Sequence, residues 1–311
     1  MSNNTTITIP IIVPAPLPLL VCWSIIGFVS TILNILVCGI VAVNARLLTV
    51  TNSFVVSLST SDLLVAGVFV PIYIVEEYSL TKVHTSGYII AFLLLASIFN
   101  LCAVTYERFV ALTKPFGYRA IMNKRKVACI IGASWVLPLI ISLLPLAWNA
   151  DHTTKYHRTY LITVVILFVL IPCIAMIWVY ARLLKIVRNF IQRNRRRTSY
   201  GNKTGERAGT EEKAARVFAI ILGMFLLCWL PFMYINVCQA FQLYHLISNG
   251  LAYASFFTLL INTILDPLIF AFLKRDFKEC IFKGKTRWLS SITSRSGHEL
   301  EELSPTCLEP L

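Results

Sequence analysis

The stretch TYERFVALTKPF, from Thr105 to Phe116, follows a long apolar run and decides how the chain is to be interpreted. No Asp, Glu, Lys or Arg occurs between Lys82 and Glu107, and then Glu107 and Arg108 stand side by side. An uncharged run of this length can cross the hydrocarbon core of a bilayer as a helix, which takes about 20 residues. Because any lysine would anchor such a helix, the acid–base pair needs a second explanation.

The composition of the whole chain indicates a lipid environment. Of its 311 residues, 57% are hydrophobic and 14% are charged, and the mean hydropathy is +0.73. Soluble domains are about 25% charged. Long apolar runs occur near 19–43, 52–75, 85–106, 127–148, 160–181, 214–240 and 246–273. The sequence therefore predicts an all-α membrane protein, a seven-transmembrane helix bundle over residues 19–273, with no room for a soluble enzyme domain.

The basic residues behind the net charge of +13 are concentrated in alternate loops, which argues against nucleic acid as a partner. Alternate loops collect Arg46, six bases from Arg108 to Lys126, eleven from Arg182 to Arg216 and seven from Lys274 to Arg295. The other loops hold only Lys82, Lys155 and Arg158. By the positive-inside rule the first set is cytoplasmic. We expect a multi-pass plasma-membrane protein with residues 1–18 outside and its C-terminus inside.

The segments that flank the bundle carry modification signals. Asn3 and Asn4 each begin an N-x-T sequon on the expected outer side and are glycosylation candidates. Residues 274–285 place apolar side chains among bases and predict a short amphipathic helix on the membrane surface. Cys280 within it is a palmitoylation candidate, with an unmodified thiol as the alternative. Residues 286–311 are predicted to be a disordered cytoplasmic tail. No disulfide is expected, because the outer loops contain no cysteine.

Two acids lie inside predicted helices, where an ionisable group is costly and indicates function. These are Asp62 and Asp266. Polar residues are expected at a similar depth: Asn34, Ser97, Asn100 and Asn262. Such a cluster can hold a small cation through oxygen ligands or share protons between the carboxylates. A neutral hydrogen-bonded network that joins helices is the alternative.

The sixth run contains a proline below large aromatic side chains. Pro231 removes a backbone hydrogen bond, so a kink is expected there. Trp229 lies two residues before it, and Phe225 lies one turn before Trp229. Aromatic residues at helical spacing pack in a core or, beside a kink, act at a hinge.

Taken in order, the motifs resemble the rhodopsin-like family of G-protein-coupled receptors over all seven helices, with similarity to its adenosine and melanocortin branch. The matching residues are Asn34, Asp62 in SLSTSDLL, the triplet Glu107-Arg108-Phe109, Trp135, Pro172, Tyr180, CWLP at 228–231 and DPLIF at 266–270. The resemblance implies a receptor that activates a heterotrimeric G protein through movement of helix six, with arrestin as a further partner.

The resemblance also implies roles for single residues. Arg108 would pack against helix six when the receptor is off and meet the G protein when it is on, and Glu211 matches its acidic partner. Ile98, Pro172 and Phe225 match the connector that relays changes in the pocket to the hinge. The set implied for an allosteric sodium ion, the only cofactor expected, is Asp62, Ser97, Trp229, Asn262 and Asp266.

The sequence departs from the family pattern in two places. Val83 stands where the family has a cysteine bonded to the second outer loop, which bears on the rigidity of that loop. Phe270 replaces the tyrosine whose hydroxyl would reach toward Tyr180 in the active state, which bears on how long that state lasts.

The expected ligand is a nucleoside-like or other small extracellular molecule. Ile90 stands where amine receptors have an aspartate, and Leu260 where opsins have the retinal lysine. Asn236 matches the asparagine with which adenosine receptors grip adenine, although Leu260 also replaces their ribose-binding histidine. Leu94 and Trp229 complete the expected pocket.

Other functions are weighed against this one. A peptide- or lipid-responsive receptor and a non-signalling receptor-like membrane scaffold are the alternatives. A seven-helix zinc hydrolase would need ligands converging in the bundle, whereas all five histidines are expected in loops or the tail. The chain is therefore not expected to be an enzyme.

Overall fold

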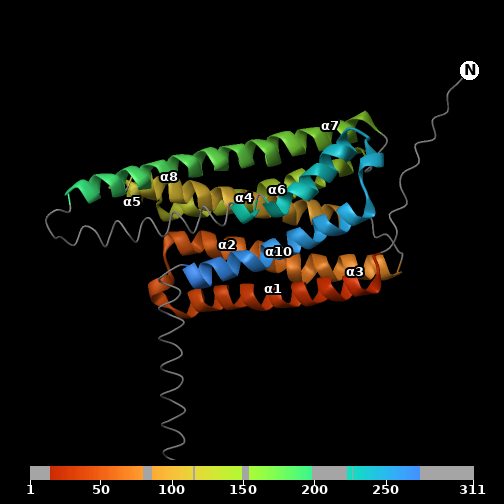
Figure 1. Ribbon diagram of the computed structural model, residues 1–311, viewed down its shortest axis with the longest axis horizontal. Coiled ribbons are helices and arrows are strands. Elements are labelled where there is room, and N and C mark those ends of the chain that lie inside the picture. Colours follow the sequence, from red (N-terminus) through yellow and green to blue (C-terminus); the bar gives the residue numbers. More distant parts are fainter. Residues whose placement is uncertain are drawn as a thin grey trace, which may run out of the picture.

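The computed structural model describes residues 15–79, 86–114, 116–148, 154–197, 223–225 and 227–273. Seven helices in these ranges are long and apolar enough to cross a membrane, and they lie side by side along the long axis of the molecule (Figure 1). The predicted all-α seven-helix bundle is confirmed. We call the end that holds Glu107 the inner end and the opposite end the outer end, following the orientation predicted from charge.

The spans follow the chain in order. They are α1 (Leu17–Val43); α2 (Val50–Leu64) with η2 (Val65–Phe69) and α3 (Val70–Ser79); α4 (Ser86–Thr113); α6 (Lys124–Leu143) with η3 (Leu144–Trp148); α7 (Lys155–Thr163) with η4 (Val164–Leu170) and α8 (Ile171–Arg197); the sixth span (Gly223–Ala240); and α10 (Asn249–Leu273). Short helical turns η1 (Ala45–Leu47), α5 (Tyr118–Ile121) and η5 (Tyr244–Leu246) lie between spans.

Two spans widen into π-helix directly before a proline. The π-helical segment η2 ends at Phe69, two residues before Pro71, and η4 ends at Leu170, two residues before Pro172. Proline lacks an N–H and clashes with the carbonyl four residues earlier. A wider turn relieves that clash, which accounts for a π-bulge at these points rather than a helix end.

Two helix boundaries differ from those expected. Helix α4 continues to Thr113, so Glu107 and Arg108 lie within the helix and not at its end. Helix α7 begins at Lys155, because the Thr154 hydroxyl accepts a hydrogen bond from the backbone N–H of His157 at 3.2 Å and caps the helix. The prediction that every histidine lies in a loop or the tail is therefore wrong for His157, which is buried in the first turn of α7.

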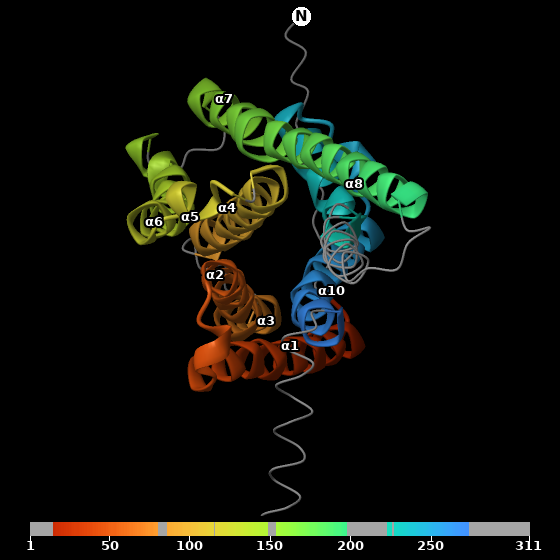
Figure 2. The same ribbon diagram turned by 90° about the vertical axis from the view of Figure 1, so that its left-hand side faces the viewer.

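Helix α4 is the central element of the core. It packs against α2, α6 and α8, while α1 packs against α2 and α10; Figure 2 shows this arrangement along the bundle. The larger apolar cluster includes Phe54, Ile98 and Phe225. A smaller one, toward the outer end, includes Trp23 and Phe256. Large apolar side chains such as Phe28, Ile140 and Ile174 remain exposed, as expected for surfaces that face lipid.

Candidate functional site

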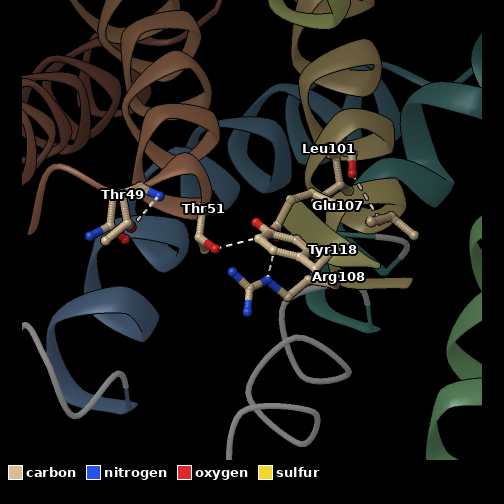
Figure 3. Close-up of polar contacts among 8 residues, drawn as sticks. Thr49, Thr51, Leu101, Glu107, Arg108 and Tyr118 are labelled. Atoms are coloured by element: carbon tan, nitrogen blue, oxygen red, sulfur yellow. Dashed lines mark hydrogen bonds and ion pairs between the residues drawn. The ribbon is translucent and has the colours of Figure 1, made fainter. Parts of the chain in front are cut away.

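A buried carboxylate organises the inner end of the bundle. Glu107 on α4 is fully buried. Its Oε1 accepts hydrogen bonds from the Thr51 hydroxyl at 2.7 Å and the Tyr118 hydroxyl at 2.6 Å. Its Oε2 lies 2.7 Å from Arg108 Nε. Figure 3 shows these four side chains converging from α2, α4 and α5. Charge-assisted hydrogen bonds of this length are among the stronger polar contacts in proteins.

The ion pair fixes the position of Arg108. Its side chain is 15% exposed, so the guanidinium is largely removed from solvent beside the carboxylate of its own neighbour in the chain. Removing one partner of such a buried pair would leave an uncompensated charge. The inner part of α4 therefore holds a restrained arginine and not a solvated anchor.

Tyr118 acts as a permanent donor in this site. Burial, followed by its hydrogen bond to Glu107, raises the pKa of the Tyr118 phenol to about 12. The hydroxyl thus keeps its proton throughout the physiological range. Neither Tyr118 nor Thr51 was predicted as a site residue. They lie 11 and 56 residues from Glu107, and no local sequence pattern connects them to it.

Other residues expected at the inner end are described only in part. Phe109 is half-buried against the larger apolar cluster. The helices that carry Tyr180 and Phe270 are described, but the side chains of these two residues are not. The remaining predicted positions, Asn3, Asn4, Glu211, Cys280 and residues 274–311, lie outside the described residues.

A second acidic site lies in the middle of the bundle. Asp62 on α2 and Asp266 on α10 are both buried, and their carboxyl groups lie within hydrogen-bonding range of each other. Neither oxygen of Asp62 receives a hydrogen bond from a donor in the described chain. Two ionised carboxylates in contact repel, so this pair requires a shared proton or a bound cation.

Three more buried polar side-chain atoms lie on α1, α10 and the sixth span. The side-chain oxygens of Asn34 and Asn262 have no donor, and Trp229 Nε1 has no acceptor, among the residues that the structure describes. Ser97 is buried on α4. Within the described ranges no cluster of three or more His, Cys, Asp or Glu side chains forms a metal site. Any cation here would therefore be held by the acid pair and amide or hydroxyl oxygens.

Asn34 also fastens α1 to α10. Its amide nitrogen donates to the backbone carbonyl of Thr263 at 2.9 Å, and the Ser30 hydroxyl donates to the Thr263 hydroxyl at 2.8 Å. These contacts cross between helices that are far apart in the sequence. They hold α10, which carries Asp266, against α1.

Asn100 was expected beside the acids, and the structure places it in a different network. The Ser57 hydroxyl donates to Asn100 Oδ1 at 2.6 Å, the Ser134 hydroxyl donates to the same oxygen at 3.2 Å, and Trp135 Nε1 donates to Ser57 at 3.0 Å. This set links α2, α4 and α6. The side chain of Asn100 thus meets hydroxyls on α2 and α6 and joins these helices to α4. For Asn100 the alternative of a neutral hydrogen-bonded network applies.

The expected connector and hinge residues lie in the core. Ile98 and Phe225 are almost fully buried, and the Phe225 ring stacks on Trp229 with 5.1 Å between ring centroids. Trp229 also meets Phe232 edge-on at 5.8 Å. Pro172 and Pro231 are half-buried in their spans.

The expected pocket residues divide between the two apolar clusters. Leu94 and Trp229 belong to the larger cluster and Leu260 to the smaller one, while Ile90 packs against both. Asn236 is half-buried, and its amide nitrogen donates to the Phe232 carbonyl at 2.8 Å. Of the five expected pocket residues, Ile90 therefore contacts both clusters.

The described cysteines are free thiols. They are Cys22, Cys38, Cys102, Cys129, Cys173, Cys228 and Cys238. All lie within the spans, where most are at least partly buried, as expected for small apolar side chains.

Seven membrane-length helices, with an acid–arginine pair at one end and an acid pair in the middle, define the class of this chain as a seven-helix membrane bundle. The model of the "7 transmembrane receptor (rhodopsin family)" matches residues 33–270. The chain belongs to this family of receptors and is not an enzyme.

Relatives with different ligands in their names are similar to this chain. The adenosine receptor A2a of Canis lupus familiaris is 30% identical over 80% of the chain and 68% of the relative. The D(1)-like dopamine receptor of Oreochromis mossambicus is 31% identical over 83% and 76%. The 5-hydroxytryptamine receptor 4 of Homo sapiens is 29% identical over 73% and 69%. The similarity covers most of each protein but is shared by receptors named for adenosine, dopamine and 5-hydroxytryptamine.

Proposed function

We propose that this receptor sits in the plasma membrane with its N-terminus outside, binds a small extracellular molecule and activates a heterotrimeric G protein. The observation that carries the proposal is the restrained Arg108. An arginine held at the inner end by Glu107 is a charge that a conformational change can release, and the released guanidinium can bind carbonyl or carboxylate groups of a partner.

The inner loop that follows α4 offers a surface for this partner. Phe116 is fully exposed on the inner loop that follows α4, two residues before Tyr118, whose hydroxyl binds Glu107. A large exposed aromatic residue beside bases is a common anchor at protein interfaces. We propose that the G protein docks here, with arrestin as a competing partner for the same surface.

Movement of the sixth span would release Arg108. Trp229 stacks on Phe225, so a ligand that shifts Trp229 moves this aromatic pair, which lies on the inner side of Pro231. In this proposal Ile98 and Pro172 relay the change, Glu211 restrains Arg108 in the off state, and Tyr180 and Phe270 meet in the on state. Because Phe270 lacks a hydroxyl, the on state is expected to be short-lived.

The test is expression in cells that carry reporters for each G-protein class, with nucleosides, lipids and peptides supplied in turn. Arg108→Ala should abolish signalling, and Glu107→Gln should raise the basal signal because it removes the charge that restrains the arginine. Surface expression of each variant is the control. A basal and ligand-induced signal unaffected by Arg108→Ala would refute the proposal, and the absence of any signal would favour a non-signalling scaffold.

For the ligand, a nucleoside-like molecule is proposed first and a peptide or lipid second. Asn236 supports a nucleoside, because a half-buried amide can exchange its intrahelical bond to Phe232 for a bidentate contact with a purine. Adenosine should then activate the wild type, and Asn236→Leu should weaken that response. A response to adenosine that Asn236→Leu leaves unchanged would count against this pocket.

We also propose that the acid pair binds sodium. The group of unpartnered oxygens on Asp62, Asn34 and Asn262 suits a hard monovalent cation. The cation would offset the repulsion between Asp62 and Asp266, with Ser97 and Trp229 near the ion. The competing explanation is a proton shared by the two carboxyl groups.

A further inference from the structure

A group of exposed bases lies where the helical turn α5 meets α6, at the inner end of the bundle. Arg119 is exposed on α5. The first three residues of α6 are exposed as well: Lys124, Arg125 and Lys126. We call these four residues the α5–α6 basic patch. The fourth apolar span begins at Lys124, which places the patch at the level of the lipid headgroups.

The charge of the patch is not balanced by acids of the neighbouring sequence. No Asp or Glu occurs between Glu107 and Asp151. Among the described residues the ion pair joins Glu107 to Arg108, and none of the four bases takes part in it. A cluster of four or more bases directly beside the inner end of a membrane helix attracts anionic lipid headgroups. The patch therefore offers positive charge to a partner from outside the chain.

The backbone that carries these bases is held by the protein itself. The Met122 N–H donates to the Tyr118 carbonyl at 2.8 Å, and the Met122 side chain is buried. The Asn123 side-chain oxygen accepts a hydrogen bond from the Lys126 N–H at 3.0 Å and caps α6. Only Met122 and Asn123 connect α5 to α6, so Arg119 stays close to the other three bases. Little ordering of the backbone is then required when a ligand binds.

The outward face of α6 continues from the patch as an apolar surface. Val136 and Ile140 are 54% and 58% exposed, and Cys129 is exposed between them and Arg125. The spacings of four, seven and four residues place these side chains on one face of the helix. Figure 2 shows α6 at the edge of the bundle, beside α4. An acyl chain that lies along this face brings its headgroup to Arg125.

The side chains of the patch suit a headgroup with several phosphates. Adjacent helix residues point about 100° apart, so Lys124 and Lys126 flank Arg125 on its two sides. A guanidinium binds phosphate through two parallel N–H···O bonds, and ammonium groups add compact positive charges. A headgroup with a single negative charge would engage only one of these groups at a time. A phosphorylated inositol can engage several.

We infer that the α5–α6 basic patch binds the headgroup of a phosphoinositide of the inner leaflet, whose acyl chains lie along the outward face of α6. Arg125 holds one phosphate, and Lys124 and Lys126 bind from either side. Phe116, the residue proposed to anchor the G protein, precedes the patch and is not part of it. The inference goes beyond the proposed function and rests on it only for the orientation that makes this end the inner one.

Direct binding of dioctanoyl phosphatidylinositol bisphosphate to the purified full-length receptor in detergent tests the site. Native mass spectrometry should show saturable binding, at least about tenfold tighter than that of dioctanoyl phosphatidylserine or of free inositol trisphosphate. Arg125→Gln should weaken it by about fivefold, and Lys124→Gln combined with Lys126→Gln by about 25-fold. Arg46→Gln removes an exposed base of the inner end outside the patch and should weaken binding by less than about twofold.

Several results would overturn the inference. Equal binding of the serine lipid would indicate diffuse attraction, and equal binding of inositol trisphosphate would assign the patch to a soluble anion. Equal weakening by Arg125→Gln and Arg46→Gln would leave the patch no special role. Normal lipid binding by Arg125→Gln together with a loss of G-protein activation would make the patch a protein interface.

Folding is controlled by thermal denaturation of each variant. The substituted side chains are exposed and have no ion pair in the described ranges, so Tm should stay within about 2 °C of the wild type. The lipid-binding measurement needs neither signalling nor a known orientation in the membrane. Its failure would therefore leave the proposed coupling through Arg108 untouched.

Discussion

Two buried carboxylate sites lie at different depths of the same bundle, and their hydrogen bonding is opposite. Glu107 has two hydroxyl donors on one oxygen and an arginine on the other. Asp62 has no donor on either oxygen in the described chain, and its neighbour is another acid, Asp266. Glu107 and Asp62 are both 0% exposed, so burial alone does not distinguish the two sites.

The two sites differ in what they need from outside the chain. Glu107 has two hydroxyl hydrogen bonds on Oε1 and an ion pair with Arg108 at Oε2, so its charge is balanced within the chain and it restrains Arg108 without a cofactor. The pair of Asp62 and Asp266 is complete only with a proton or cation, so its state can change with the surroundings. One site is therefore suited to hold a conformation and the other to sense a ligand.

Removing the charge at each site should give the largest contrast. Glu107→Gln should lower the free energy of unfolding by roughly 3 kcal/mol, because it removes the carboxylate charge from a buried ion pair, and thermal denaturation should show a fall in Tm of about 6–12 °C. Asp62→Asn, measured beside it in potassium buffer, should not lower Tm, because it removes a repulsive contact. Equal losses in the two variants would contradict the comparison.

Sodium should stabilise the wild-type receptor at the middle site. At a sodium concentration of ten times Kd, binding adds about 1.4 kcal/mol to the free energy of unfolding, so Tm should rise by about 3–6 °C when sodium replaces potassium. Asp62→Asn should lose this rise. Equal sodium sensitivity of wild type and variant would refute the ion site, and an insensitive wild type would favour the shared proton.

The third effect concerns the phenol that holds Glu107. Tyr118→Phe should lower the free energy of unfolding by about 1.5 kcal/mol, because one donor to a buried carboxylate is lost. Since the pKa of Tyr118 is raised from 10.0 to about 12, the contribution is fully present below pH 10 and is lost as the pH rises toward 12. The Tm difference between wild type and variant should therefore be the same at pH 7 and pH 9. A difference that disappears by pH 9 would contradict this role.

The sequence predicts the two sites unequally, for physical reasons. Uncharged runs identify the spans, and an acid inside such a run is so costly that Asp62 and Asp266 stand out without a structure. Arg108 stands out in the same way. Thr51 and Tyr118 do not, because hydroxyl residues are common in membrane helices and loops, and only the packing of α2 and α5 against α4 brings them to Glu107.

The neighbouring helix toward which a side chain points cannot be predicted from one sequence either. Asn100 and Asn34 are both buried asparagines, yet Asn100 bonds to Ser57 and Ser134 while Asn34 bonds to Thr263. Depth along a helix follows from residue number, but the face presented to each neighbour depends on how helices are rotated and packed. The start of α7 was missed because it depends on a single cap. The Thr154 hydroxyl accepts from the His157 N–H and extends the helix over His157.

The smallest expected effect is at the second hydroxyl on Glu107. Thr51→Val keeps the shape of the side chain but removes the hydroxyl that donates to Glu107 at 2.7 Å, so it should cost about 1 kcal/mol. Thr60→Val is the matched control, because the Thr60 hydroxyl bonds the Val56 carbonyl of its own helix and meets the weakly accepting Cys38 thiol, contacts of little net value. Thermal denaturation should show a fall in Tm of about 2–4 °C for Thr51→Val and almost none for Thr60→Val. If both variants behaved alike, Thr51 would be one more helix hydroxyl, and the satisfaction of Glu107 would depend on Tyr118 and Arg108 alone.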